Sequence, residues 1–199
     1  SAVCLERAAV MRDLGQKLVA ADWRTIDIMA DDLPETADLV VASYMLNEVA
    51  DPIFAARKLW NAAESVLLIV ESALPESVAL LQKIRTDLTE RGAHVAAPCP
   101  HDKPCAEWCH FACRIERSRL HKQLKGGDAP FEDEKFSFIA LTKAPALRRS
   151  ARVLRHPQIG TNKVGLTLCT PDGIIEKTVF KSDKALYKIA RKAKTGDAL

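Results

Sequence analysis

The sequence lacks any apolar run long enough to cross a bilayer, and it has no internal repeat and no low-complexity tract. It also lacks a secretory signal, because its opening residues, SAVCLERAAVMRDLG, already have the pattern of packed structure. Hydrophobic residues make up 48% and charged residues 28% of the 199 positions, as in ordinary globular domains. We therefore expect a soluble protein, with no membrane partner, that has one sizeable core or one core plus a small module.

The net charge of +3 conceals an acidic half and a basic half. Residues 1–98 contain 9 Lys and Arg against 15 Asp and Glu, a balance of −6, whereas residues 99–199 contain 20 against 11, a balance of +9. A basic half joined to an acidic one is typical of a domain that carries a polyanion-binding surface. A solvated lysine-rich surface is the alternative interpretation.

The first half of the chain alternates between helical and strand-like segments. Helical periodicity or helix boundaries occur in 7–21, 51–63 and 76–92, with Asp51 as an N-cap and Gly92 as the end of the last helix. Residues 38–46 and 65–72 are short continuous apolar runs, as expected for parallel strands covered on both faces. This alternation predicts an α/β fold with a doubly wound sheet.

The second half has a different pattern, and each of its segments carries its own signal. We expect a basic helix over 113–127, an acidic turn at 131–134, a strand over 135–143 and a connector over 144–150. Residues 164–170 and 174–180 flank Pro-Asp-Gly and predict a β-hairpin, and 184–194 predict a final basic helix.

Four of the six cysteines lie between Cys99 and Cys113, in the segment CPHDKPCAEWCHFAC. Five residues separate Cys99 from Cys105, three separate Cys105 from Cys109, and Cys169 lies far downstream in the predicted hairpin. Since the chain has no secretory hallmark, this cluster is more typical of a metal site than of disulfides.

The backbone of this segment is suited to convergence of the thiolates on one point. Pro100 and Pro104 keep it extended. A helix could begin only near Ala106, and Cys109 and Cys113 would then share a face.

The spacing alone leaves the identity of the metal open. Structural zinc ligands usually come in pairs with two to four residues between them, so the five-residue gap and the remote fourth cysteine favour an iron–sulfur cluster. His101, His110 and the fifth cysteine keep zinc and buried, unligated thiols as alternatives. Cys4, alone in the first strand-like segment, is most simply a small buried hydrophobe.

Several motifs together resemble one family, the methyltransferase-like assembly factors of the mitochondrial small ribosomal subunit and their bacterial homologues. The motifs cover nearly the whole chain: DLVVASYMLNEV, LLIVES, RGAHVAAPCPH, APCPHDKPCAEWCHF, RIERSRLHKQLKGG, EDEKFSFIAL, LCTPDG and ARKAKTGD. The resemblance implies a Rossmann-like class I methyltransferase sheet with a cysteine-rich metal-binding insertion and a C-terminal β-hairpin extension. It divides the chain into 1–96, 97–127 and 128–199, the last containing the final sheet strand, the hairpin and the basic helix.

The same resemblance implies a [4Fe–4S] cluster held by four cysteines, with zinc as the alternative metal. The ligands that it implies are Cys99, Cys105, Cys109 and Cys169. Cys113 is the alternative to Cys109, because the spacing of three residues after Cys105 is shorter than in bacterial relatives.

The front of the chain departs from a complete methyltransferase. The glycine-rich turn that holds S-adenosylmethionine after the first strand is missing, and Gly15 is the first glycine. We therefore expect the chain to be the C-terminal part of a longer protein and to be inactive alone. In the full-length protein, Glu6 would hold the ribose of the cofactor, and Asn47 and Glu48 would lie near the substrate; helix capping is the structural alternative for the latter two.

Three functions follow as hypotheses. The first is an assembly factor that binds small-subunit ribosomal RNA and ribosomal proteins, with the cluster as a structural staple. The second is an S-adenosylmethionine-dependent rRNA methyltransferase; no catalytic base is evident, although methyl transfer by proximity needs little side-chain chemistry. The third is an iron or redox sensor. We expect the bacterial cytoplasm as the location, with the mitochondrial matrix as the alternative. The residues expected to bind RNA lie on the predicted basic helix: Arg114, Arg117, Arg119, His121, Lys122 and Lys125.

Overall fold

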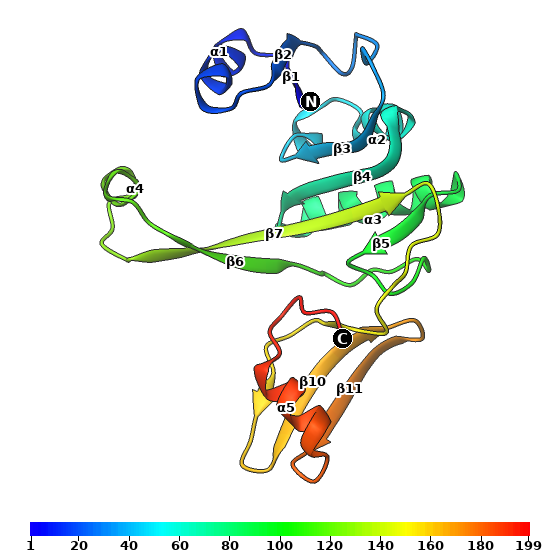
Figure 1. Cartoon of the computed structure of the whole chain (residues 1–199), viewed down its shortest axis with the longest axis vertical. Coiled ribbons are helices and arrows are strands. Elements are labelled where there is room, and N and C mark those ends of the chain that lie inside the picture. The colour runs from blue at the N-terminus through cyan, green and yellow to red at the C-terminus, as the bar shows by residue number, and fades with distance from the viewer.

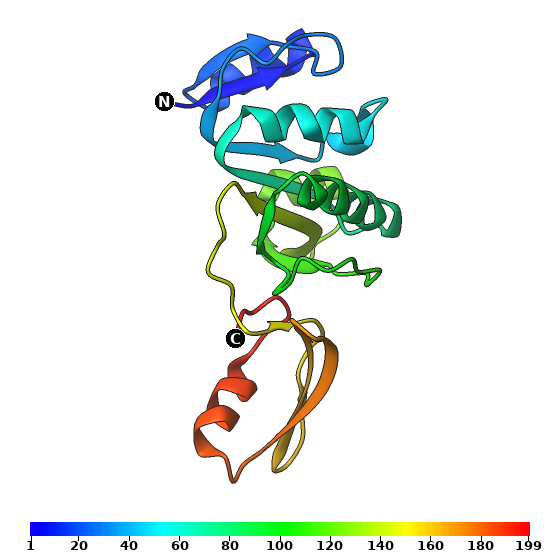
Figure 2. The same ribbon diagram turned by 90° about the vertical axis from the view of Figure 1, so that its right-hand side faces the viewer.

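A computed structural model describes residues 1–199 and shows an elongated molecule in three parts (Figure 1). A small N-terminal unit lies at one end, an α/β sheet with its helices lies in the middle, and a β-rich part lies at the other end (Figures 1 and 2). We call the central part the sheet module (37–143) and the last part the C-terminal module (151–199).

The N-terminal unit is a βαβ segment that buries little of its surface. It consists of β1 (Val3–Glu6), α1 (Ala9–Leu18) and β2 (Asp22–Thr25), and the two strands pair in parallel apart from the main sheet. The helix predicted in 7–21 is confirmed. However, α1 buries none of its residues, and its apolar Val10 and Leu18 are 79% and 77% exposed.

The main sheet is mixed. Its strands are β3 (Ala37–Ser43), β4 (Ala63–Ser72), β5 (His94–Ala97), β6 (Phe111–Glu116) and β7 (Phe131–Thr142). The order is β3–β4–β7–β5, and β6 also pairs with β7. β3 and β4 are parallel, as the two apolar runs predicted, whereas β7 is antiparallel to β4, β5 and β6. β7, the last strand of the sheet along the chain, therefore lies at the centre of the sheet.

The helices of the sheet module begin and end where local signals place them. They are α2 (Pro52–Ala62) and α3 (Pro75–Glu90), with a short 3-10 helix, η1 (Leu46–Glu48), before α2. Asp51 caps α2 by accepting a hydrogen bond from the Phe54 amide at 2.9 Å, which confirms the predicted N-cap. Gly92, with φ +89°, allows the chain to turn after α3.

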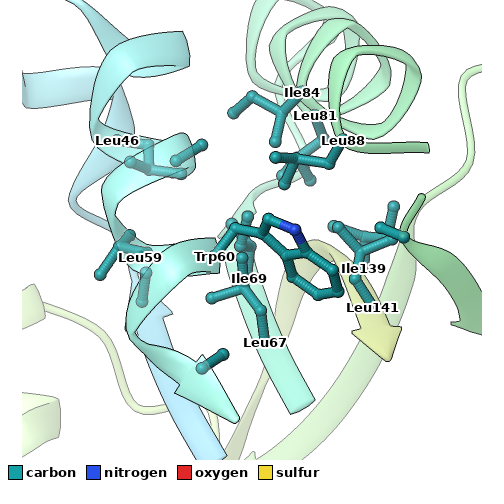
Figure 3. Packing of buried hydrophobic residues seen from close by; sticks show 14 of the residues in the cluster. Leu46, Leu59, Trp60, Leu67, Ile69, Leu81, Ile84, Leu88, Ile139 and Leu141 are labelled. Atoms are coloured by element: carbon teal, nitrogen blue, oxygen red, sulfur yellow. The ribbon is translucent and has the colours of Figure 1, made fainter. Parts of the chain in front are cut away.

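A core of 16 buried residues lies between this sheet and the two helices (Figure 3). Leu67 and Ile69 of β4 point to the same face, and residues of both α2 and α3 pack against them, with Trp60 near the centre. The alternate residues, such as Leu68, are only half-buried. Within this chain, helices thus cover only one face of the sheet, so the prediction of a doubly wound sheet is wrong here. A continuous apolar strand is compatible with helices on one face as well as with helices on both faces.

The predicted basic helix over 113–127 is only partly helical. Its first residues form β6, which pairs with the start of β7 and extends away from the sheet as a two-stranded arm (Figure 1). The helix at the tip, α4 (Arg119–Lys125), is capped by Ser118 and ends at Gly126 in the left-handed region. The acidic segment 131–134 is the first part of β7 and no turn. Strand pairing along the arm has overridden the helical spacing of 113–117.

The C-terminal module has a second, separate core. Its elements are β8 (Arg152–Val153), β9 (Gln158–Ile159), β10 (Lys163–Thr170), β11 (Gly173–Phe180) and α5 (Lys184–Lys192). The predicted hairpin and final helix are confirmed, and α5 packs on the hairpin to form a cluster of eight buried residues. No helix anywhere in the structure has the length and apolar character needed to cross a membrane.

Candidate functional site

The loop after β5, residues 98–110, lies between the sheet module and the C-terminal module. Three cysteines, Cys99 and Cys109 of this loop and Cys169 of β10, line one small cavity of about 10 Å³. Pro98, Phe111, Arg152 and Leu154 complete its lining. Residues that are distant in sequence thus meet at the junction of the two modules.

Polar contacts from the C-terminal side hold this loop in place. The Arg152 Nε donates to the Pro98 carbonyl at 2.9 Å, and the Lys103 Nζ donates to the Pro171 carbonyl at 2.9 Å. Arg155 forms an ion pair with Glu107. The loop itself contains no helix, so the helix that could have begun near Ala106 does not form. Side chains and carbonyls, rather than a regular element, therefore position the cysteines.

The thiols at this junction affect one another electrostatically. Burial raises the pKa of the Cys109 thiol to about 12, with contributions from Cys99 and Cys105. Burial also raises the pKa of Cys169 to about 11, again with Cys99 and Cys105 contributing, and it raises the pKa of Cys99. Burial therefore disfavours isolated thiolates at Cys99, Cys109 and Cys169.

The remaining cysteines lie elsewhere. Cys113 is exposed on β6, opposite Glu134 in the register of the arm, and Cys4 is half-buried in β1. His110 contacts the Trp108 ring at a centroid distance of 4.8 Å. As the side chains stand in the structure, no group of three or more His, Cys, Asp or Glu residues is arranged to hold a metal ion.

Two arginines beside the cysteines were missed from the sequence. Arg85 of α3 is only 3% exposed, and its Nη2 donates to the His101 carbonyl at 2.7 Å, while its Nε has no partner. Arg152, which lines the cavity, has a pKa lowered by burial. A signal for Arg85 did exist, because Leu81, Arg85 and Leu88 follow the spacing of three and four that marks a buried helix face.

The residues predicted to act in methyl transfer lie at the ends of parallel strands. Glu6 ends β1, and its carboxylate accepts a hydrogen bond from the Ala8 amide at 2.7 Å. Asn47 donates to the buried carboxylate of Glu71 at 2.7 Å, while Glu48 is exposed in η1. Glu71, only 1% exposed, also accepts from the Leu46 amide. Sequence reasoning missed Glu71, although a glutamate at the end of an apolar strand run is a recognisable signal.

A strained residue lies beside this group. Tyr44 follows β3 with φ 53°, the left-handed region that non-glycine residues seldom adopt, and its amide donates to the Val70 carbonyl at 2.8 Å. Burial raises the pKa of the Tyr44 hydroxyl, with Glu134 contributing. This shift disfavours the phenolate form of Tyr44.

The six basic residues predicted to bind RNA are not equivalent. Arg117, His121 and Lys125 surround the carboxylate of Glu132 at 3.1, 3.1 and 3.0 Å, and Arg114 pairs with Asp133 at 2.7 Å. Lys125 first, and then Arg117, lower the pKa of Glu132, and Arg114 lowers the pKa of Asp133. Arg119 and Lys122, on α4 at the tip of the arm, form no ion pair and no hydrogen bond through their side chains.

The structure thus defines an α/β protein with a mixed, Rossmann-like sheet and a β-rich module, with a cysteine-bearing loop at the junction between them. The whole sequence, residues 1–199, matches the family described as "Mitochondrial small ribosomal subunit Rsm22". The chain belongs to this family, which confirms the resemblance inferred from the motifs.

Curated relatives agree with this assignment. The chain is 26% identical over 228 residues to the human ribosome assembly protein METTL17, mitochondrial, covering 99% of this chain and 49% of the relative. It is 24% identical over 213 residues to the Rsm22-cox11 tandem protein 2, mitochondrial, of Schizosaccharomyces pombe, covering 80% and 28%. The chain therefore spans about half the length of the human relative and less than a third of the yeast relative.

Solved structures show a weaker likeness. A candidate RNA methyltransferase from Pyrococcus horikoshii aligns with a TM-score of 0.41 and 14% identity, over 71% of this chain and 63% of that one. A candidate methyltransferase from Thermoplasma acidophilum aligns with a TM-score of 0.44 and 16% identity, over 73% and 59%. Since both scores are below 0.5, family membership rests on the sequence match.

Proposed function

We propose that this chain is part of an assembly factor of the small ribosomal subunit, in which a thiolate metal centre fixes two modules for binding to ribosomal RNA. The observation that carries this proposal is the convergence of loop and hairpin cysteines at the junction, in a chain of the Rsm22 family. The human relative is named a ribosome assembly protein, which supports the role, and the relatives' names support a mitochondrial location.

The residues at the junction fit a metal centre in their donor chemistry. Four thiols from two segments are soft ligands of the type that holds iron–sulfur clusters or zinc. The buried Arg85, with one N–H unpartnered and no carboxylate partner, lies where an anionic centre would compensate its charge. We propose Cys99, Cys105, Cys109 and Cys169 as the ligands of a [4Fe–4S] cluster, with zinc as the alternative.

The metal would act as a structural link between the modules. A cluster bound by the loop and by Cys169 would join the end of β5 to the β10–β11 hairpin, where polar contacts already link the two modules. Metal binding of this kind contributes directly to folding free energy. It would thereby fix the basic C-terminal module relative to the arm.

RNA binding is proposed for the tip of the arm and the basic C-terminal half. Arg119 and Lys122 lie at the tip of the arm with no carboxylate partner, so they are free to contact phosphates. The pairs on Glu132 and Asp133 would instead stiffen the arm. Of the six residues predicted to bind RNA, Arg119 and Lys122 are therefore expected to have the largest effect on binding.

Methyl transfer by a longer protein is the second candidate. It is favoured by the strained Tyr44 beside Glu71 and Asn47 at the carboxyl ends of β3 and β4, because strained residues cluster at functional sites. S-adenosylmethionine would be the cofactor, with Glu6 near its ribose. The hydrogen bonds of Asn47 also serve the local structure, so this candidate ranks second.

The experiment that tests RNA binding compares two double charge reversals. We expect Arg119→Glu/Lys122→Glu to weaken binding of a small-subunit rRNA transcript and to reduce the salt slope by about 2, or about 1 per phosphate contact, in anisotropy titrations at several salt concentrations. Lys17→Glu/Lys83→Glu changes the net charge equally on the N-terminal unit and α3 and is the matched control. Equal losses in both variants would show that only the overall charge matters and would contradict the proposal.

A further inference from the structure

The cysteine junction contains two arginines that form no ion pair with a carboxylate. Neither Arg85 nor Arg152 lies within ion-pair distance of an Asp or Glu. The contacts of Arg85 are the His101 carbonyl at 2.7 Å and the His101 Nδ1 at 3.3 Å, and those of Arg152 are the carbonyls of Pro98 and Gly196. Because Arg85 is 3% exposed, an anion held close to it would stabilise its charge.

The thiolate centre of the proposed function would supply that negative charge. Four thiolates around Zn²⁺ or a [4Fe–4S]²⁺ core carry a net charge of about −2. Two arginines beside the cysteines would balance it: Arg152 lines the cavity with Cys99 and Cys169, and Arg85 is held against the loop that carries Cys99. The junction would then contain little net charge once loaded.

His101 connects Arg85 to one of the cysteines. The His101 side chain is buried, with its Nδ1 facing the Arg85 Nη2 at 3.3 Å and its Nε2 facing the Cys169 Sγ at 3.7 Å. A guanidinium can only donate hydrogen bonds, so Nδ1 must be the acceptor. In the neutral ring the proton is therefore on Nε2, and it is directed at the sulfur of Cys169.

We propose that Arg85 and Arg152 are the counter-charges of the metal centre, and that Arg85 fixes His101 in the tautomer that donates an N–H···S hydrogen bond to Cys169. The proposal rests on the metal centre of the proposed function. Arg85 and His101 are positioning residues, since they act through the Cys169 sulfur. Hydrogen bonds to cluster sulfurs and nearby positive charge both stabilise the more negative, reduced state, so this arrangement raises the reduction potential and retards loss of metal.

The test uses anaerobically purified protein and two readouts, the rate of metal loss to a chelator and the midpoint potential from a redox titration. The variants are His101→Leu, which removes the donor, and His101→Gln, whose amide nitrogen can replace Nε2. Arg85→Met removes the positive charge, whereas Arg85→Lys keeps the charge and changes only the shape of the side chain. Arg91→Met, at the C-cap of the same helix and in a surface ion pair with Asp87, is the control. Circular dichroism of each variant checks folding.

We expect His101→Leu and Arg85→Met to weaken metal retention by about 10- to 100-fold and to shift the potential to more negative values. His101→Gln and Arg85→Lys should recover part of both effects, and Arg91→Met should match the wild type. Wild-type retention and potential in folded His101→Leu protein would overturn this inference while leaving the metal centre intact. If the purified wild-type protein contains neither iron nor zinc, both the metal centre and this inference are overturned. If it contains zinc alone, the rate of metal loss to the chelator remains the decisive readout.

Discussion

The two modules and the junction between them are held together in different ways. The sheet module has a core of 16 buried residues and the C-terminal module has one of eight, and no residue belongs to both. Phe111 and Leu154, buried at the junction, belong to neither cluster. Each module can therefore pack on its own, whereas their relative position depends on polar contacts, a few apolar side chains and the cysteines.

The largest effect on how the two modules are held together is expected when one of the proposed metal ligands at the junction is removed. Cys169→Ser should lose bound metal, because one of four thiolates is replaced by a poor ligand for soft metals. Cys113→Ser is the matched control, since Cys113 lies exposed on the arm. Iron, sulfide and zinc analysis of both variants measures the difference. Metal retained in Cys169→Ser but lost in Cys113→Ser would reverse the ligand assignment.

Truncations in the two cores should destabilise only the module that contains them. Leu67→Ala in β4 and Leu166→Ala in β10 remove fully buried side chains, and each should lower the free energy of unfolding by about 2–5 kcal/mol. In calorimetry of metal-stripped protein, we expect each variant to shift a different transition. A single transition shifted equally by both variants would show that the modules unfold as one unit.

A smaller effect is expected where the chain end contacts the arm. Gly196 has φ +92°, and a Cβ added there would lie 2.8 Å from the Cδ1 of Phe111. Gly196→Ala should therefore lose about 1–3 kcal/mol of stability through strain, plus the displacement of Phe111. Gly92→Ala has a similar φ, +89°, with open space around it, so it measures strain alone. Equal losses of unfolding free energy in denaturant titrations would mean that Phe111 moves aside freely.

The smallest effect concerns a surface ion pair of the sheet module. Hydrogen bonds from Arg57, at 2.9 Å through its Nε, hold the pKa of Asp87 below its ordinary value, and Arg91 contributes. A lowered folded-state pKa adds stability that is present above the unfolded-state pKa and lost as pH falls through the folded-state value. Asp87→Asn should therefore lose less than about 1 kcal/mol at pH 7, because both arginines are well exposed.

The matching measurement is denaturant unfolding of wild type and Asp87→Asn at pH 7 and at a pH below the folded-state pKa of Asp87. The difference between the two proteins should shrink at the lower pH, where the carboxylate of the wild type is protonated. A difference that stays constant across this range would show that the hydrogen-bonding shape of Asp87, rather than its charge, is responsible.

Local signals predicted the elements well, and long-range pairing accounts for the errors. Asp51, Gly92 and the Pro-Asp-Gly turn mark boundaries that depend on neighbouring residues, and all three are confirmed. Residues 113–116 have helical spacing but belong to a strand, because their partners in β7 lie about twenty residues away. The ion pairs on Glu132 could not be predicted for the same reason, since only the antiparallel register places it beside Arg117.

The junction shows a similar division between local and long-range information. The cysteine spacing indicated a metal site, but the cavity shared with Cys169 depends on how the hairpin meets the loop. Arg85 could have been found from its place on the buried face of α3. Its orientation toward His101, and that of His101 toward Cys169, depend on tertiary packing that periodicity does not contain.

The most direct test of the proposed role of the junction is amide hydrogen exchange of the metal-loaded and metal-stripped protein. If a metal centre joins two independently packed modules, stripping should speed exchange in the loop 98–110 and in 152–155, while β4 and β10 keep their protection. Unchanged exchange at the junction would contradict the linking role. Loss of protection throughout both cores would contradict their independence.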